Sequence, residues 1–112
     1  MAVVDNLEAL LAKGTERAAC PPGYNALLRF GLANEYLRLG QLEQAIGHLR
    51  KAVAHDPKYS AAWKRFGQAL AESGRHDEAV EAYKEGIRVA QEKGDVQAAK
   101  EMQVFLNRLQ KP

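Results

Sequence analysis

The strongest constraint on the fold of this chain is an internal repeat with an offset of 34 residues. Under that shift large residues fall on large ones and small residues on small ones. The matched pairs are Leu32 with Phe66, Ala33 with Gly67, Tyr36 with Leu70, Gly40 with Gly74, Ala45 with Ala79, Ile46 with Val80, Leu49 with Tyr83, Ala52 with Gly86 and Val53 with Ile87. Within each copy the apolar residues recur at intervals of three or four, which predicts helices rather than strands. We therefore expect an all-α protein that contains two similar helical hairpins.

Glycines and a proline mark where these helices meet and end. Glycine inside a helix costs on the order of 1 kcal/mol relative to alanine. Gly67 and Gly86 therefore predict contacts between helices that are too close for a methyl group. Gly40 and Gly74 stand where the first helix of each hairpin should end in a left-handed residue. Pro57 separates the hairpins, because the residue before proline disfavours the helical conformation.

These residues carry a resemblance to a known family. The run Trp63, Phe66, Gly67, Leu70, Gly74, Ala79, Tyr83 and Gly86 resembles the tetratricopeptide repeat pattern, as does the run Leu32, Ala33, Tyr36, Gly40, Ala45, Leu49, Ala52 and Pro57. The resemblance covers about residues 26 to 91 and implies an α–α superhelix. The first repeat departs from the pattern at Arg29, where an aromatic residue is common. The second departs at Gln91, where proline is usual, so its last helix should continue to about Lys93.

The two ends of the sequence should cover the ends of such a repeat array. Gly94 and Asp95 resemble a helix stop and the N-cap of a further helix. The apolar side of this capping helix should be Val96, Ala99, Met102, Leu106 and Leu109, with Lys100, Glu101 and Arg108 in water. At the other end Val4, Leu7, Leu10 and Leu11 predict a short amphipathic helix. The expected organisation is one domain, 1–112, made of an N-terminal helix and connector (1–23), repeat 1 (24–57), repeat 2 (58–93) and the capping helix (94–112).

Composition and motifs speak against catalysis, cofactors and nucleic acid. The chain has 16 basic and 14 acidic residues that alternate along its length, a net charge of +2 that gives little reason to bind phosphate backbones. His48, His55 and His76 lack cysteine or acidic partners at metal-ligand spacing, and Cys20 has no activating base nearby. We expect no metal, no cofactor and no enzymatic activity. Without a signal peptide or an apolar run of membrane-spanning length, the expected location is the cytoplasm.

The resemblance implies that the inner, concave face of each first helix binds a protein partner, either a peptide or a helix. By register that face carries the predicted binding residues Leu27, Phe30, Asn34 and Arg38 in repeat 1, and Lys64 and Gln68 in repeat 2. Some family members grip a C-terminal carboxylate with a clamp of Lys and Asn residues. Asn34 matches one clamp position, but Phe30 and Arg65 replace a lysine and an asparagine. Asp95 and Ala99 replace the basic residues of a third repeat, so we do not expect this clamp.

Two alternatives to a non-catalytic adaptor or assembly factor stay open. The chain could be a structural homo-oligomer, such as a homodimer, with no foreign ligand, or a small enzyme whose site the sequence does not reveal. A further alternative concerns the stripe formed by Leu27, Phe30 and Leu37. It could form the floor of a peptide groove, or the N-terminal helix could cover part of it. We expect partial covering, because that helix needs an apolar partner.

Overall fold

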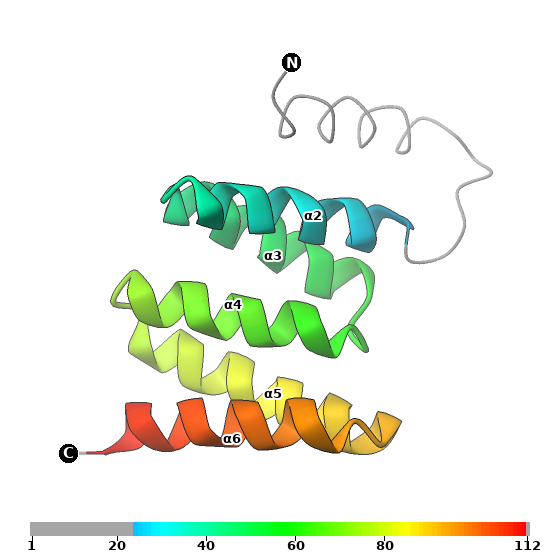
Figure 1. Cartoon of the computed structure of the whole chain (residues 1–112), viewed down its shortest axis with the longest axis vertical. Coiled ribbons are helices and arrows are strands. Elements are labelled where there is room, and N and C mark those ends of the chain that lie inside the picture. The colour runs from blue at the N-terminus through cyan, green and yellow to red at the C-terminus, as the bar shows by residue number, and fades with distance from the viewer. Residues whose placement is uncertain (1–23, 112) are drawn as a thin grey trace. The chain divides into compact units, whose positions relative to one another are not determined.

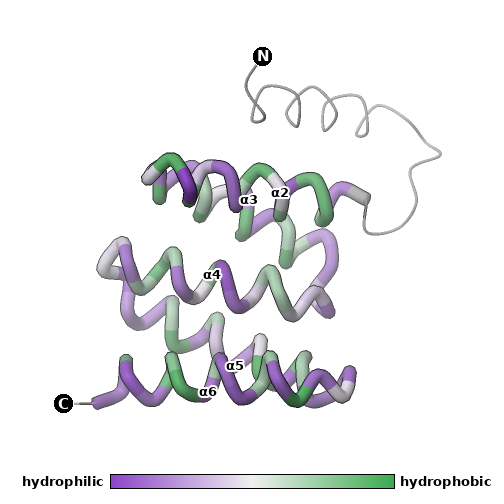
Figure 2. Tube along the Cα trace, viewed as in Figure 1, coloured by the Kyte–Doolittle hydropathy of each residue, from purple (hydrophilic) through white to green (hydrophobic). Residues whose placement is uncertain are grey.

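The computed structural model describes residues 24–111, and all the regular elements in that range are α-helices (Figure 1). They are α2 (Tyr24–Arg38), α3 (Leu42–His55), α4 (Ser60–Glu72), α5 (His76–Lys93) and α6 (Val96–Gln110). The expected all-α repeat fold is thereby confirmed, whereas the predicted N-terminal helix lies outside the described residues. The chain divides into two compact units, Met1–Asp56 and Pro57–Pro112. Hydrophobic and hydrophilic residues are interspersed along α2 to α6 (Figure 2), and in α3 to α6 they gather on opposite sides, as expected for helices that bury one side.

In the first unit α2 and α3 pack against each other as a hairpin. Small residues on both helices are completely buried, among them Ala33 on α2 and Ala45 on α3. The buried residues are Ala26, Leu28, Leu32 and Ala33 on α2, and Ala45, Ile46, Leu49, Ala52 and Val53 on α3. Gly40 adopts the predicted left-handed conformation with φ of 76°. The chain can therefore reverse there, and the N–H of Gln41 donates to the carbonyl oxygen of Tyr36 at 2.9 Å.

A polar cluster occupies the position in this hairpin where the family commonly has an aromatic residue. Nη1 of Arg29 donates to Nδ1 of His48 at 3.0 Å, and the His48 ring stacks on Tyr36 with ring centroids 5.4 Å apart. Two buried polar atoms in this part of α2, Arg29 Nε and Asn25 Oδ1, have no hydrogen-bond partner in the described structure. Burial also lowers the pKa of Arg29. Arg29 of repeat 1 thus occupies the position that the large aromatic ring of Trp63 occupies in repeat 2.

In the second unit α5 packs against both α4 and α6, and α4 also contacts α6. One hydrophobic cluster joins the three helices. Its buried members are Tyr83, Ala90, Met102 and Leu106, and it is enclosed by Trp63, Val80, Ile87, Ala98, Ala99, Phe105 and Leu109. The α6 helix is therefore part of the core of this unit and covers α5, as the sequence predicted for a capping helix.

Both helical glycines of this unit lie at the close contacts that the sequence predicted. A methyl group at Gly67 would come within 2.5 Å of Cε1 of Tyr83. A methyl group at Gly86 would come within 2.5 Å of Sδ of Met102 and 2.8 Å of Cβ of Trp63. Both distances are well below van der Waals contact, so these two glycines allow the helices to approach.

The connection between α5 and α6 also follows the prediction. Gly94 is left-handed with φ of 74° and ends α5 directly after Lys93. Asp95 is the N-cap of α6, because its Oδ1 accepts from the N–H of Ala98 at 3.2 Å. Its other carboxylate oxygen accepts from Oγ of Ser60 at 3.4 Å, which ties the cap to the start of α4.

The predicted sides of α6 need three corrections. Val96 was expected on the covered side but is 61% exposed. Phe105 was not predicted to be in the core, yet its ring stacks on Tyr83 with centroids 5.8 Å apart. Glu101 was expected in water and instead forms an ion pair with Lys64 of α4. The other four residues predicted on the covered side, Ala99, Met102, Leu106 and Leu109, are buried or partly buried. The buried positions of α6 follow those of α4 with an offset of 36 residues. Under that offset Phe66 and Leu70 correspond to Met102 and Leu106.

Candidate partner-binding faces

Four of the predicted binding residues share one side of α2. Leu27, Phe30, Asn34 and Arg38 follow one another at intervals of three, four and four residues, which places them along one face of a helix. Leu27 is 57% exposed, Phe30 and Asn34 are partly exposed, and Arg38 is exposed. The face therefore begins with an exposed apolar side chain and ends with a charged one.

The positive charge at the end of this face already has an acidic neighbour. Nε and Nη2 of Arg38 both donate to Oε2 of Glu35, at 3.0 and 2.9 Å. Because the Arg38 side chain is 67% exposed, solvent and salt screen this pair and it contributes little to stability.

The other two predicted residues lie one turn apart on α4, and both have contacts within the second unit. Nζ of Lys64 donates to Oε2 of Glu101 on α6 at 2.5 Å. Oε1 of Gln68 accepts from Nη1 of Arg65 at 3.4 Å. The hydrogen bonds from Lys64 and then from Gln97 lower the pKa of Glu101. The charge of Lys64 is thus partly balanced inside the molecule.

The sequence did not reveal the pairing of Lys64 with Glu101. The two residues are 37 positions apart, and no local spacing rule links them. The predicted N-cap at Asp95 fixes where α6 begins, but it does not show which residue of α4 faces Glu101. The six predicted residues divide between the units, four on α2 and two on α4. Their grouping as one binding site remains a prediction.

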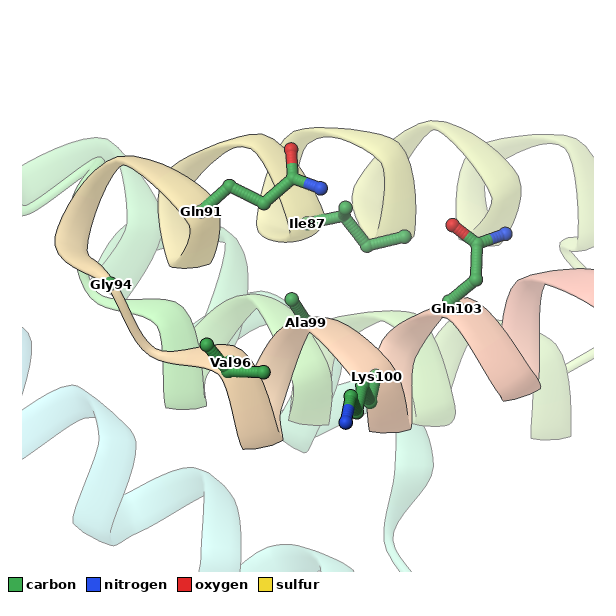
Figure 3. A pocket seen from close by; sticks show the side chains of 7 residues that line it. All are labelled: Ile87, Gln91, Gly94, Val96, Ala99, Lys100 and Gln103. Carbon is green, nitrogen blue, oxygen red and sulfur yellow. The ribbon is translucent and has the colours of Figure 1, made fainter.

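A hollow that the sequence analysis missed lies between α5 and α6 in the second unit (Figure 3). Its volume is about 370 Å³, and mostly apolar atoms line it. The lining residues are Ile87, Gln91, Gly94, Val96, Ala99, Lys100 and Gln103. We call this feature the α5–α6 hollow. Aligning α6 with α4 at an offset of 36 residues places Gln103 at the position of Gly67, which faces α5. That alignment is the sequence signal that could have indicated this hollow.

The described residues carry no arrangement typical of metal binding. No group of three or more potential ligands (His, Cys, Asp or Glu) comes together anywhere in residues 24–111. His55 and His76 are exposed, and His48 belongs to the polar cluster described above. None of the helices in the same range is long and apolar enough to cross a membrane.

Paired helices with small residues at their crossings and left-handed glycines at their ends define a helical-repeat protein. Residues 30–92, more than half of the chain, match the tetratricopeptide repeat family. The chain therefore belongs to the tetratricopeptide repeat family, as the sequence resemblance indicated. Domains of this family are protein-interaction modules rather than enzymes.

Individual relatives agree with this assignment along nearly the whole chain. TPR repeat-containing protein PA0015 of Pseudomonas aeruginosa is 45% identical over 107 residues, which cover 96% of this chain and 94% of that protein. The solution structure of protein BPP2914 from Bordetella parapertussis has 42% sequence identity and a TM-score of 0.76, and the match covers 97% of this chain and 88% of that one. The second TPR domain of human RPAP3, in complex with an HSP70 peptide, has 29% sequence identity and a TM-score of 0.64. That match covers 96% of this chain and 84% of the RPAP3 domain.

Proposed function

We propose that this chain is a non-catalytic adaptor or assembly factor of the cytoplasm that binds a peptide or helix of another protein. The proposed binding residues lie on α2 in the first unit and on α4 in the second. Leu27 and Phe30 supply apolar contacts, Asn34 and Gln68 hydrogen-bond the partner, and Arg38 and Lys64 attract its acidic groups. Amide side chains suit the second role because each both donates and accepts hydrogen bonds.

The observation that carries this proposal is the exposure of Leu27. Most large apolar side chains of α2 and α3 are buried or half-buried, whereas Leu27 is 57% exposed in the middle of the first half of α2. It shares its helix face with Phe30, Asn34 and Arg38. Apolar groups bordered by polar ones are typical of surfaces that bind other proteins.

The structural neighbour with a bound peptide supports a peptide as the partner. The second TPR domain of RPAP3 holds the HSP70 peptide SGPTIEEVD, which contains three acidic residues. The proposed face here also offers cations, Arg38 and Lys64. Each already has an acidic neighbour, Glu35 or Glu101, so a partner must compete for them. We therefore expect electrostatic attraction to be modest and apolar anchoring to dominate affinity.

A carboxylate clamp of the chaperone-binding kind is not part of the proposal. With the α6 register at 36 residues, the third-repeat clamp positions shift from Asp95 and Ala99 to Gln97 and Glu101. Glu101 is acidic and lies against Lys64, so it would repel a terminal carboxylate. We expect a partner that is anchored through side chains along its length rather than through its C-terminus.

The experiment that tests the proposal uses a partner recovered by affinity purification and measures binding to the full chain by surface kinetics. Leu27→Ala should weaken binding about fivefold, and Phe30→Ala about tenfold, because aromatic anchors contribute strongly. The matched control is Leu39→Ala. Leu39 is 50% exposed but lies in the turn after α2, away from the proposed face. It should leave binding unchanged.

Circular dichroism must first show that the Leu27, Phe30 and Leu39 variants fold. If folded Leu27→Ala and Phe30→Ala bind the partner as tightly as Leu39→Ala does, the α2 face is not the site. Concentration-dependent light scattering then tests the remaining alternative, a homodimer with no foreign ligand. A stable homodimer that these substitutions disrupt would identify the face as a contact between copies instead.

A further inference from the structure

The α5–α6 hollow has the geometry of a helix-packing site that no described helix fills. Aligning α6 with α4 at an offset of 36 residues places Gln103 at the position of Gly67. On α4 this position faces α5, where Gly67 lies against the ring of Tyr83. On α6 the same position is exposed and lines the hollow (Figure 3). Among residues 24–111 no helix packs on this side of α6 as α5 packs on α4.

A helix is the occupant that the walls of this hollow can accept. Apart from Gly94, the lining residues belong to two α-helices, which have no sheet edge that could pair with an extended strand. The contact must be made by side chains. Ile87, Val96 and Ala99 supply apolar surface, and the amides of Gln91 and Gln103 line the same hollow. Ridges and grooves of this kind are filled by an amphipathic helix.

The charges around the hollow select the type of helix. Lys100 lines the hollow and has no acidic partner in the described structure. The acidic residues nearby are engaged, since Glu92 pairs with Arg88 and Asp95 caps α6. Lys100 is thus the one charged residue among those that line the hollow, and its charge is positive.

We propose that the α5–α6 hollow binds an acidic amphipathic α-helix of another protein, which packs on α6 as α5 packs on α4. A second copy of this chain fits less well. A symmetric dimer through this face would bring the Lys100 charges of both copies into one interface, and like charges disfavour such a contact. The site is separate from the α2 and α4 faces and does not depend on them.

The α5 helix itself provides a defined probe of this chemistry. It carries five acidic and three basic residues, a net charge of −2, and its apolar side is shaped to pack on a first helix. The probe is a stapled, fluorescent peptide with the sequence of residues 76–93 and Tyr83→Ala, because Gln103 leaves no room for the phenol ring. A control peptide has the five acidic residues replaced by glutamine. The target is the full chain, studied by fluorescence anisotropy and by amide NMR shifts.

The structure offers matched control positions on and next to α6. Val96 and Val104 are both exposed, at 61% and 49%, but only Val96 lines the hollow. Lys100 and Lys111 are both exposed cations, but only Lys100 lines it. Val96→Glu should fold normally, because a carboxylate in the first turn of a helix interacts favourably with the helix dipole.

The proposal expects shifts at Ile87, Ala99 and Gln103 when the acidic probe is added. Val96→Glu should weaken probe binding at least tenfold and Lys100→Glu about fivefold, while Val104→Glu and Lys111→Glu stay within twofold of wild type. The control peptide should bind several-fold more weakly. Phe30→Ala should have no effect, which separates this site from the one proposed above.

Three results would overturn the inference. The first is the absence of shifts at the hollow with millimolar acidic probe. The second is an equal loss of binding in Val96→Glu and Val104→Glu, which would show that α6 has no local site. The third is a dimer of the unliganded chain in light scattering that Val96→Glu dissociates, since the occupant would then be a second copy.

Discussion

The phenol ring of Tyr83 lies directly against Gly67, so close that a Cβ atom at residue 67 would be only 2.5 to 2.8 Å from three of its ring carbons. Tyr83 is 1% exposed and also stacks on Phe105 of α6. One side chain therefore holds together all three helices of the second unit. The small residue on α4 is what allows this arrangement, because helices can approach closely only where a side chain is missing.

The first prediction follows from that contact. Gly67→Ala should destabilise the protein by about 1–3 kcal/mol, because the added methyl group forces the Tyr83 ring to move in a packed core. The matched control is Gly47→Ala on α3, which is exposed and has open space around its Cβ position. That change should stabilise by up to about 1 kcal/mol through helix propensity. Urea denaturation measures both, and effects of the same sign would contradict the packing described here.

A second prediction concerns α6. Met102 is completely buried and lies against Gly86, so Met102→Ala should cost about 2–5 kcal/mol. Val104 on the same helix is 49% exposed, and Val104→Ala should change stability by no more than about 0.5 kcal/mol. If thermal and urea unfolding show small changes for both variants, α6 does not contribute to the core of the second unit.

A third prediction tests the start of α6. Asp95→Ala removes the acceptor for the N–H of Ala98 and for Oγ of Ser60, and should cost about 1 kcal/mol. Asp95→Asn keeps a capping oxygen, so it should retain most of the stability. Amide hydrogen exchange in the first turn of α6 should accelerate in the alanine variant and stay near the wild-type rate in the asparagine variant. If exchange in the first turn of α6 stays at the wild-type rate in both variants, the cap is not needed.

The fourth prediction is a pH dependence at alkaline pH. Burial, with a smaller effect from the charge of Glu72, raises the pKa of Tyr83 from 10.0 to about 12. The unfolded chain then releases the phenol proton near pH 10 and the folded chain only near pH 12. The stabilisation from the neutral phenol is complete below pH 10 and is lost between pH 10 and 12, by about 1.4 kcal/mol per pH unit.

Urea denaturation between pH 8 and 11.5 checks this prediction. Other groups also titrate in that range, so the informative quantity is the difference between wild type and Tyr83→Phe, which removes the ionising group. The difference should be constant up to pH 10 and then change in favour of the variant. Parallel curves for the two proteins would rule out a raised pKa at Tyr83.

The amino-acid sequence by itself determined which segments become helices, where they end and which family they belong to. Gly40, Gly74 and Gly94 end helices because only glycine adopts the left-handed conformation without strain, and all three have positive φ. The close contacts at Gly67 and Gly86 were also predictable, because glycine inside a helix is unfavourable unless space requires it. Rules of this kind act within a few residues or at a fixed repeat spacing, so a single sequence shows them.

Only the tertiary structure decided the limits of the covered side of α6 and which charges meet. The apolar spacing within α6 correctly placed Ala99, Met102, Leu106 and Leu109 on the covered side. The structure adds that Val96 is exposed and that Phe105 stacks on Tyr83. It also pairs Glu101 with Lys64 and leaves Gln103 at the α5–α6 hollow. Apolar spacing alone therefore predicts the helix and most of its covered side, whereas the residues at the margins of that side and the charge pairs depend on contacts between residues far apart in the sequence.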